Sequence, residues 1–108
     1  MKLINDFKRK HFDMMPGKKR EMDTITLHNS TSNAHKAAVT ALCQLLKAIG
    51  IHFFCEAHLK YGVRPDIIAP QLPKCLIEVR HTESQTTTEQ KAQKLPAELK
   101  ARVLLIDI

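Results

Sequence analysis

The sequence predicts a mixed α/β domain, in which helices flank a four-stranded sheet in the order αβββαβ, preceded by a basic N-terminal extension. Three observations predict this class. Apolar residues recur at helical spacing over residues 33–49. Three short apolar runs, bounded by turn residues, follow between residues 51 and 81. A last apolar run, residues 101–107, comes after a second helical segment, and a strand that returns after a helix can pair in parallel.

The bulk composition describes one ordinary globular domain. The chain has 108 residues, of which 44% are apolar and 26% are charged, as in a typical soluble domain. No apolar run is long enough to span a membrane, and the start, MKLINDFKRK, lacks the apolar stretch of a secretory signal. We therefore expect an intracellular, cytoplasmic protein with no membrane partner. Three scattered cysteines, Cys43, Cys55 and Cys75, fit reduced core thiols better than a disulfide framework.

Positive charge is concentrated at the N-terminus. The formal charge is +6, and residues 1–20 hold seven Lys or Arg against two Asp, a net of +5. We assign residues 1–30 to a basic arm or short helix and residues 31–108 to the α/β domain. A basic arm suits contact with the phosphate backbone of DNA, and the alternative is a solubilising arm without a partner. The predicted contact residues are Lys8, Arg9, Lys10, Lys18, Lys19 and Arg20.

Two helices are predicted in the first half of the chain. Residues 2–13 form a short basic helix, which Pro16-Gly17 interrupts. An amphipathic helix covers residues 33–49, with N-cap candidates in NSTSN and with Gly50 just past its end. Its predicted buried stripe consists of Ala38, Ala41, Leu42, Leu45, Leu46 and Ile49.

Four strands complete the predicted sheet. They cover residues 51–60, 63–70, 75–81 and 101–107. The turn at Tyr61-Gly62 makes the first two strands a hairpin. In the first strand, the side chains expected to share one face are Ile51, Phe53, Cys55 and Ala57. A helix over residues 85–94 and a further turn in AELK precede the last strand, whose continuous apolar run suits burial on both faces.

Two carboxylates interrupt the apolar runs of the second and third strands. Asp66 precedes Ile67-Ile68-Ala69, and Glu78 follows Cys75-Leu76-Ile77. If these strands are neighbours, the two acids converge, and close carboxylates repel unless they share a proton or a cation. Mg²⁺ is held by one or two carboxylates together with water and substrate phosphate. Arg80 shares the face of Glu78 and could offset charge on a phosphate.

The pattern RPDII…IEVR resembles the signature of the PD-(D/E)XK nuclease superfamily, the restriction-endonuclease-like fold, whose common core is αβββαβ. The resemblance covers roughly residues 33–107 and matches Pro65-Asp66 to the PD, Glu78 to the second acid and Arg80 to the position usually held by lysine. It implies a metal-dependent endonuclease that hydrolyses phosphodiester bonds in DNA by metal-activated water. In that family pattern Asp66, Glu78 and the Val79 carbonyl hold Mg²⁺ or Mn²⁺, and small members commonly work as homodimers.

This chain departs from the family pattern in two places. Arg80 handles protons poorly, because a guanidinium stays protonated near neutral pH, so Lys91 is an alternative candidate. The first helix offers His35 or Asn33 where the family often has an acid, and Glu56 is a further candidate acid. A second hypothesis is therefore a catalytically degenerate nucleic-acid-binding protein on the same fold. A third is an interaction module in which the basic arm is incidental.

Overall fold

The computed structural model describes residues 1–18, 21–27, 32–80 and 92–108. Its elements, in chain order, are α1 (Lys2–His11), α2 (Asn33–Ala48), β1 (Phe54–Cys55), β2 (Ile67–Ile68), β3 (Leu76–Arg80), α4 (Ala97–Lys100) and β4 (Val103–Asp107). The mixed α/β class is confirmed. The helix predicted over residues 85–94 falls mainly on residues outside the described ranges, so the full αβββαβ order stays a prediction.

The four strands form one mixed, open sheet in the order β1-β2-β3-β4. β1 pairs with β2 and β2 pairs with β3, both antiparallel, whereas β3 and β4 are parallel. The predicted hairpin and the predicted parallel last strand are therefore both present. The register aligns Cys55 with Ile67 and Ile67 with Ile77, and it fixes which side chains share a face.

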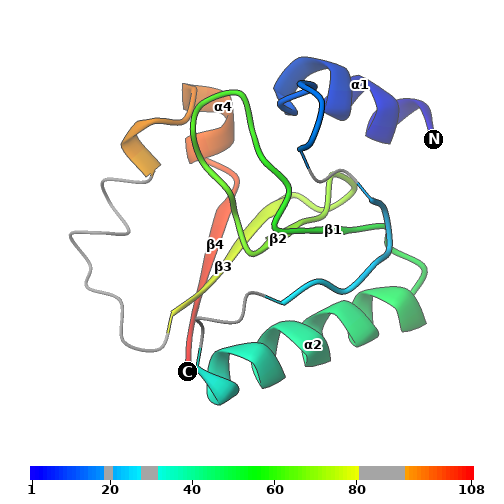
Figure 1. Cartoon of the computed structure of the whole chain (residues 1–108), viewed down its shortest axis with the longest axis vertical. Helices are drawn as coiled ribbons and strands as arrows, with labels where there is room; N and C mark the ends of the chain where they lie inside the picture. The colour runs from blue at the N-terminus through cyan, green and yellow to red at the C-terminus, as the bar shows by residue number, and fades with distance from the viewer. Residues whose placement is uncertain (19–20, 28–31, 81–91) are drawn as a thin grey trace.

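Each face of the sheet carries its own apolar core. On one face, Phe54, Ile68 and Leu76 pack with side chains of α1 and α4. On the other face, Cys55 and the residues beside it on β2 and β3 pack against α2. Figure 1 shows α2 running along one side of the sheet, with α1 and α4 on the opposite side. Because side chains alternate along the strands, each short strand contributes residues to both cores.

The N-terminal helix is part of the core. Ile4 and Phe7 are buried on its inner face, and Phe12, directly after the helix, is fully buried. Phe12 forms an isolated bridge with Leu59, and its ring meets the ring of Phe54 edge to face at 4.9 Å. The basic residues of α1 therefore lie on an element anchored to the sheet.

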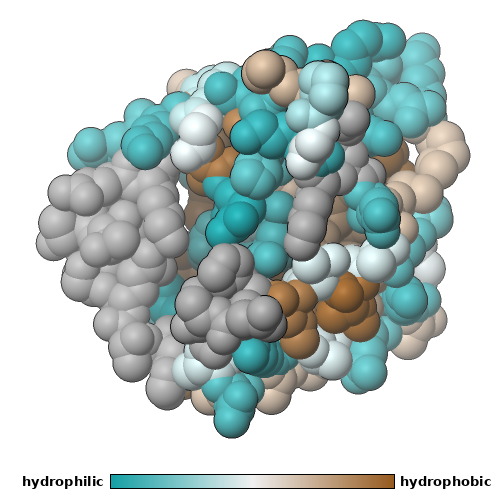
Figure 2. Space-filling model, viewed as in Figure 1, coloured by the Kyte–Doolittle hydropathy of each residue, from teal (hydrophilic) through white to brown (hydrophobic). Residues whose placement is uncertain are grey.

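Helix α2 buries a stripe that only partly matches the predicted one, since Leu46 is buried and Ala38 and Leu42 pack against the core. Ser32 caps it by accepting a hydrogen bond from the His35 backbone N–H at 3.1 Å. The buried face consists of Val39, Cys43 and Leu46, whereas two residues of the predicted stripe, Leu45 and Ile49, are 55% and 60% exposed. The helix carries two overlapping apolar stripes, and the sheet covers only one of them. Figure 2 shows apolar side chains at the surface over α2 among mainly hydrophilic neighbours.

The first predicted strand is mostly not a strand. Only Phe54–Cys55 pairs as β1, because Glu56 has a φ of 51° and turns the chain out of extended conformation. This turn also shifts the alternation. Ala57, expected on the face of Phe53 and Cys55, packs instead in the Phe54 core.

The last strand is not buried on both faces as predicted. β4 is the outermost strand of the sheet, and Leu104 and Leu105 are 38% and 39% exposed. An apolar run is equally compatible with a central strand and with an edge strand, because periodicity does not report the number of neighbours.

Burial of His11 makes stability sensitive to acid. Burial lowers the pKa of His11 from 6.5, although Glu98 opposes the shift, and the ring contacts the Tyr61 hydroxyl at 2.9 Å. Below pH 6.5 the unfolded chain therefore binds this proton more readily than the folded one, so folding stability falls as the pH drops. We expect the urea midpoint to drop less between pH 7.5 and pH 5.5 in His11→Gln than in the parent protein.

The matched control for this prediction is Tyr61→Phe, which removes the hydroxyl but keeps the buried imidazole. This variant should retain the acid sensitivity of the parent. An unchanged acid dependence in His11→Gln would contradict the assignment to His11.

Candidate functional site

The strand register brings the two motif acids to opposite positions. The β2–β3 ladder aligns Ile67 with Ile77, so one further step sets Asp66 opposite Glu78. The β1–β2 pairing also continues to Asp66, because the Glu56 N–H donates to the Asp66 carbonyl at 3.1 Å. The Asp66 carboxylate, however, turns toward α2, since it lies 3.3 Å from Nε2 of His35, whereas alternation along β3 puts Glu78 on the face of Leu76, away from α2. Asp66 and Glu78 therefore lie on or next to neighbouring strands, and the convergence of their carboxylates stays a prediction.

The Asp66 carboxylate contacts one backbone donor and one histidine. Its Oδ2 atom accepts the Val79 backbone N–H at 2.8 Å and lies 3.3 Å from Nε2 of His35. The Asp66 and His35 side chains are only 17% and 14% exposed. His35 comes from the first turn of α2, which the Ser32 cap fixes. The residue at the position of the family's helix acid thus contacts the first motif acid.

The second nitrogen of His35 lies in a dry environment. Nδ1 is buried and has no hydrogen-bond partner in the described part of the chain. The imidazole is suited to orient the Asp66 carboxylate through the 3.3 Å contact of its other nitrogen.

The Val79 carbonyl faces the same end of β2. Along β3, odd-numbered residues direct their backbone groups toward β2, since the Cys75 carbonyl accepts the Ala69 N–H at 2.8 Å. The regular ladder does not continue to Pro65, since the Val79 N–H donates to the Asp66 carboxylate and a proline has no N–H to donate in return. A backbone carbonyl and carboxylates are oxygen ligands of the kind that suit a hard divalent ion.

Arg80 is engaged by an acid on the neighbouring strand. Its Nε and NH2 groups donate to Asp107 at 2.7 and 2.9 Å, and the β3–β4 register aligns the two residues. The pair is bidentate, which is the strong geometry for a guanidinium and a carboxylate. Arg80 lies on the same face as Glu78, as predicted from the alternation, but contact with a phosphate would require it to share or exchange this partner.

The remaining candidates are less well placed. Glu56 lies opposite Asp66, but its positive φ turns its side chain away from the direction that regular strand alternation would give it. Lys91 lies outside the described residues. Within the described ranges, no three His, Cys, Asp or Glu side chains are grouped so that they could hold a metal ion. An ion at this site would therefore depend on two carboxylates and a carbonyl.

The predicted basic contacts are distributed over a folded surface. Lys8 lies 5.7 Å from the centre of the Phe54 ring, Arg9 pairs with Asp6 at 2.6 Å, and Lys10 pairs with Glu98 at 3.1 Å. These cations stand in the last turn of α1, where the helix dipole favours positive charge. Lys19 and Arg20 lie outside the described residues.

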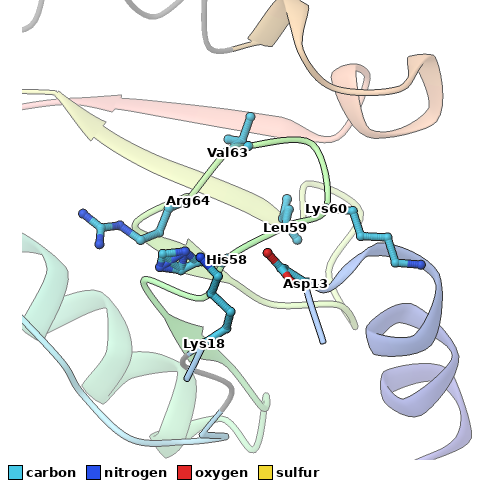
Figure 3. A pocket seen from close by; sticks show the side chains of 8 residues that line it. Asp13, Lys18, His58, Leu59, Lys60, Val63 and Arg64 are labelled. Carbon is cyan, nitrogen blue, oxygen red and sulfur yellow. The ribbon is translucent and has the colours of Figure 1, made fainter. Parts of the chain in front are cut away.

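Lys18 lines a pocket of about 270 Å³ that the sequence analysis did not foresee. Three further basic side chains, His58, Lys60 and Arg64, line it together with one acid, Asp13. Figure 3 shows the Asp13 carboxylate directed toward the middle of the pocket, with Lys60 and Arg64 on opposite sides. The available signal was the stretch HLKYGVRPD, which sets three basic residues shortly before Asp66. The excess of positive charge favours anions.

Comparisons with protein-family models, with curated proteins and with solved structures gave no match. The functional argument therefore rests on the residues and on the geometry of the sheet. Among the described residues, no helix is long and apolar enough to cross a membrane.

Proposed function

We propose that this chain is a metal-dependent endonuclease of the αβββαβ, PD-(D/E)XK type, which hydrolyses phosphodiester bonds in DNA. The observation that supports the proposal is the antiparallel pairing of β2 with β3, together with the hydrogen bond from the Val79 N–H to the Asp66 carboxylate, which ties the first acid to the strand that carries Glu78.

Asp66, Glu78 and the Val79 carbonyl would hold Mg²⁺ or Mn²⁺. Such an ion supplies a Lewis acid and an activated water. Asp66 is prepared for this role, because the Val79 N–H and His35 hold one of its oxygens and so fix the orientation of the carboxylate. His35 positions this ligand from the helix where family members often carry an acid. Arg80 offsets negative charge on the phosphate once it exchanges Asp107 for substrate.

Cations on α1 and in the basic pocket contact the phosphate groups of the substrate. Lys8, Arg9 and Lys10 lie on α1, while Lys18 and Arg64 line the basic pocket. Phosphate contacts of this kind give binding without base specificity. A homodimer in the cytoplasm, with one site for each strand of a duplex, belongs to the same proposal.

A second candidate function is nucleic-acid binding without cleavage. The ion pair between Arg80 and Asp107 favours it, because the residue in the lysine position of the motif is already occupied. Under this alternative the acids and the basic surface remain, but no hydrolysis takes place.

A plasmid assay separates the two candidates. Supercoiled DNA is incubated with the full chain in Mg²⁺, Mn²⁺, Ca²⁺ or EDTA, and binding is measured in parallel at several salt concentrations. We expect nicked or linear product in Mg²⁺ or Mn²⁺ and none in EDTA. Salt-sensitive binding without product in any metal would support the second candidate, and the absence of both would contradict both.

A further inference from the structure

Two thiols from different elements touch in the core beneath the site. Cys43 of α2 and Cys55 of β1 have their Sγ atoms 3.3 Å apart, and the residues are 0% and 5% exposed. Both are free thiols. A disulfide has an S–S bond of about 2.05 Å, so bond formation requires an approach of only about 1.2 Å. Side-chain rotation and a small shift of a short strand can supply such a distance.

We propose that Cys43 and Cys55 form an oxidative modification site, at which a peroxide-class oxidant converts the thiol pair into an intramolecular disulfide. The bond would join α2 to β1. This inference does not depend on nuclease activity, since it uses only the two sulfur atoms and their surroundings.

The two thiols are electronically unequal. The hydrogen bond between them is the main cause that lowers the pKa of Cys55 to about 7, against the opposing effect of burial. The same bond, together with burial, raises the pKa of Cys43. Cys55 is therefore the thiol that ionises more readily near neutral pH, and Cys43 is the protonated donor. A nucleophilic thiolate next to a resolving thiol is the arrangement that redox-sensitive cysteine pairs use.

The chemistry balances with hydrogen peroxide as the oxidant. The Cys55 thiolate attacks one peroxide oxygen, the O–O bond breaks, and the leaving hydroxide takes up the proton that the thiol released. Cys43 sulfur then attacks the sulfenic sulfur of Cys55, the S–S bond forms, and the S–O bond breaks. The departing hydroxide leaves as water with the Cys43 proton. Two thiols lose two electrons in total, and one peroxide becomes two waters.

Access to the pair runs through the weakest edge of the sheet. β1 is two residues long, lies at one edge of the sheet, and ends at Glu56 with its φ of 51°. On its outer side only an isolated bridge between Met22 and Phe54 covers it. A short edge strand opens locally at lower free energy than the central strands, and we expect oxidant to reach Cys55 through such local opening.

Cys75 provides an internal control. It is also buried, but it packs in the core on the opposite face of the sheet, and burial raises the pKa of its thiol. Cys75 is as buried as the pair but has different neighbours. Selective oxidation of Cys43 and Cys55 would therefore reflect their mutual contact and not their exposure.

The test uses the purified, reduced full chain. The protein is treated with hydrogen peroxide, the free thiols are alkylated under denaturing conditions, and tryptic peptides are mapped without reductant. Trypsin sets the three cysteines on separate peptides, residues 37–47, 48–60 and 75–80. We expect the first two peptides to be cross-linked and the third to be alkylated. Consumption of Cys75 at the same rate, or three alkylated thiols after an exposure that fully oxidises a small-molecule thiol, would overturn the proposal.

Two further measurements strengthen the test. The oxidation rate should rise through about pH 7, the pKa of Cys55, and level off about one pH unit above it, whereas a thiol with the ordinary pKa of about 9 would keep gaining reactivity to higher pH. The cross-link should raise the Tm by about 5–15 °C. The Cys75→Ala variant should give the same rise, and Cys43→Ala should give none. A Tm that does not rise on complete oxidation would show that the closed bond strains the fold, contrary to the proposal.

Discussion

Asp66→Asn is expected to lose metal-dependent cleavage by about 100-fold or more while keeping the fold and the affinity for DNA. Asparagine loses the charge that a divalent ion needs from its ligand. Its side-chain oxygen can still accept the Val79 N–H that Oδ2 accepts in the native protein at 2.8 Å. The plasmid assay, a salt titration of DNA binding and a urea midpoint measure the three quantities on one preparation.

Asparagine is the sharper substitution because alanine would confound two effects. In Asp66→Ala the Val79 N–H would lose its partner in a part-buried position, at a cost of about 1–3 kcal/mol. A loss of activity could then reflect a distorted β3. With Asp66→Asn, an unchanged rate of cleavage would contradict the proposed site directly.

The chain offers a matched control in Asp23. Its carboxylate also contacts one histidine, His52 at 2.8 Å, and accepts one backbone N–H, that of Phe53 at 3.1 Å. Asp23 is not part of the sequence pattern that contains Asp66 and Glu78, and it lies outside β2 and β3. Asp23→Asn should therefore leave cleavage unchanged, and equal losses in both variants would point to a general effect of removing a partly buried charge.

The antiparallel pairing of β1, β2 and β3 could be predicted because local signals agree with the fold. A Tyr-Gly turn joins the first two apolar runs, each run is short, and Asp66 and Glu78 sit at its ends. Pairing of neighbouring strands then sets the register within a residue or two. The contact between His35 and Asp66 follows less directly from the sequence, because it depends on which face of the sheet α2 covers.

Other features have no local signal. The left-handed conformation of Glu56 falls on a residue type that rarely adopts it, so the alternation of residues 51–60 predicted too long a strand. The partner of Arg80 comes from 27 residues further along the chain. The exposure of β4 reflects the number of strands that flank it, which no single run of residues encodes.

Phe12→Ala is expected to destabilise the whole domain by about 3–5 kcal/mol, the usual cost of emptying a fully buried aromatic site. Phe12 is 0% exposed, and its ring is packed edge to face between Phe7 and Phe54. Such a loss is a large fraction of the stability of a small domain. The urea midpoint would therefore fall sharply, with α1 and the sheet unfolding in one transition.

The control is Leu3→Ala on the same helix, where the side chain is 55% exposed and the expected change is within about 0.5 kcal/mol. A cost below about 1 kcal/mol for Phe12→Ala would mean that residues 1–30 behave as a separable arm. The distinction matters for the nuclease proposal. If α1 is integral, deleting residues 1–20 removes core side chains along with charge, and loss of DNA binding in that deletion reports unfolding. Charge-neutralising substitutions at Lys8, Arg9 and Lys10 then become the appropriate test of the basic surface.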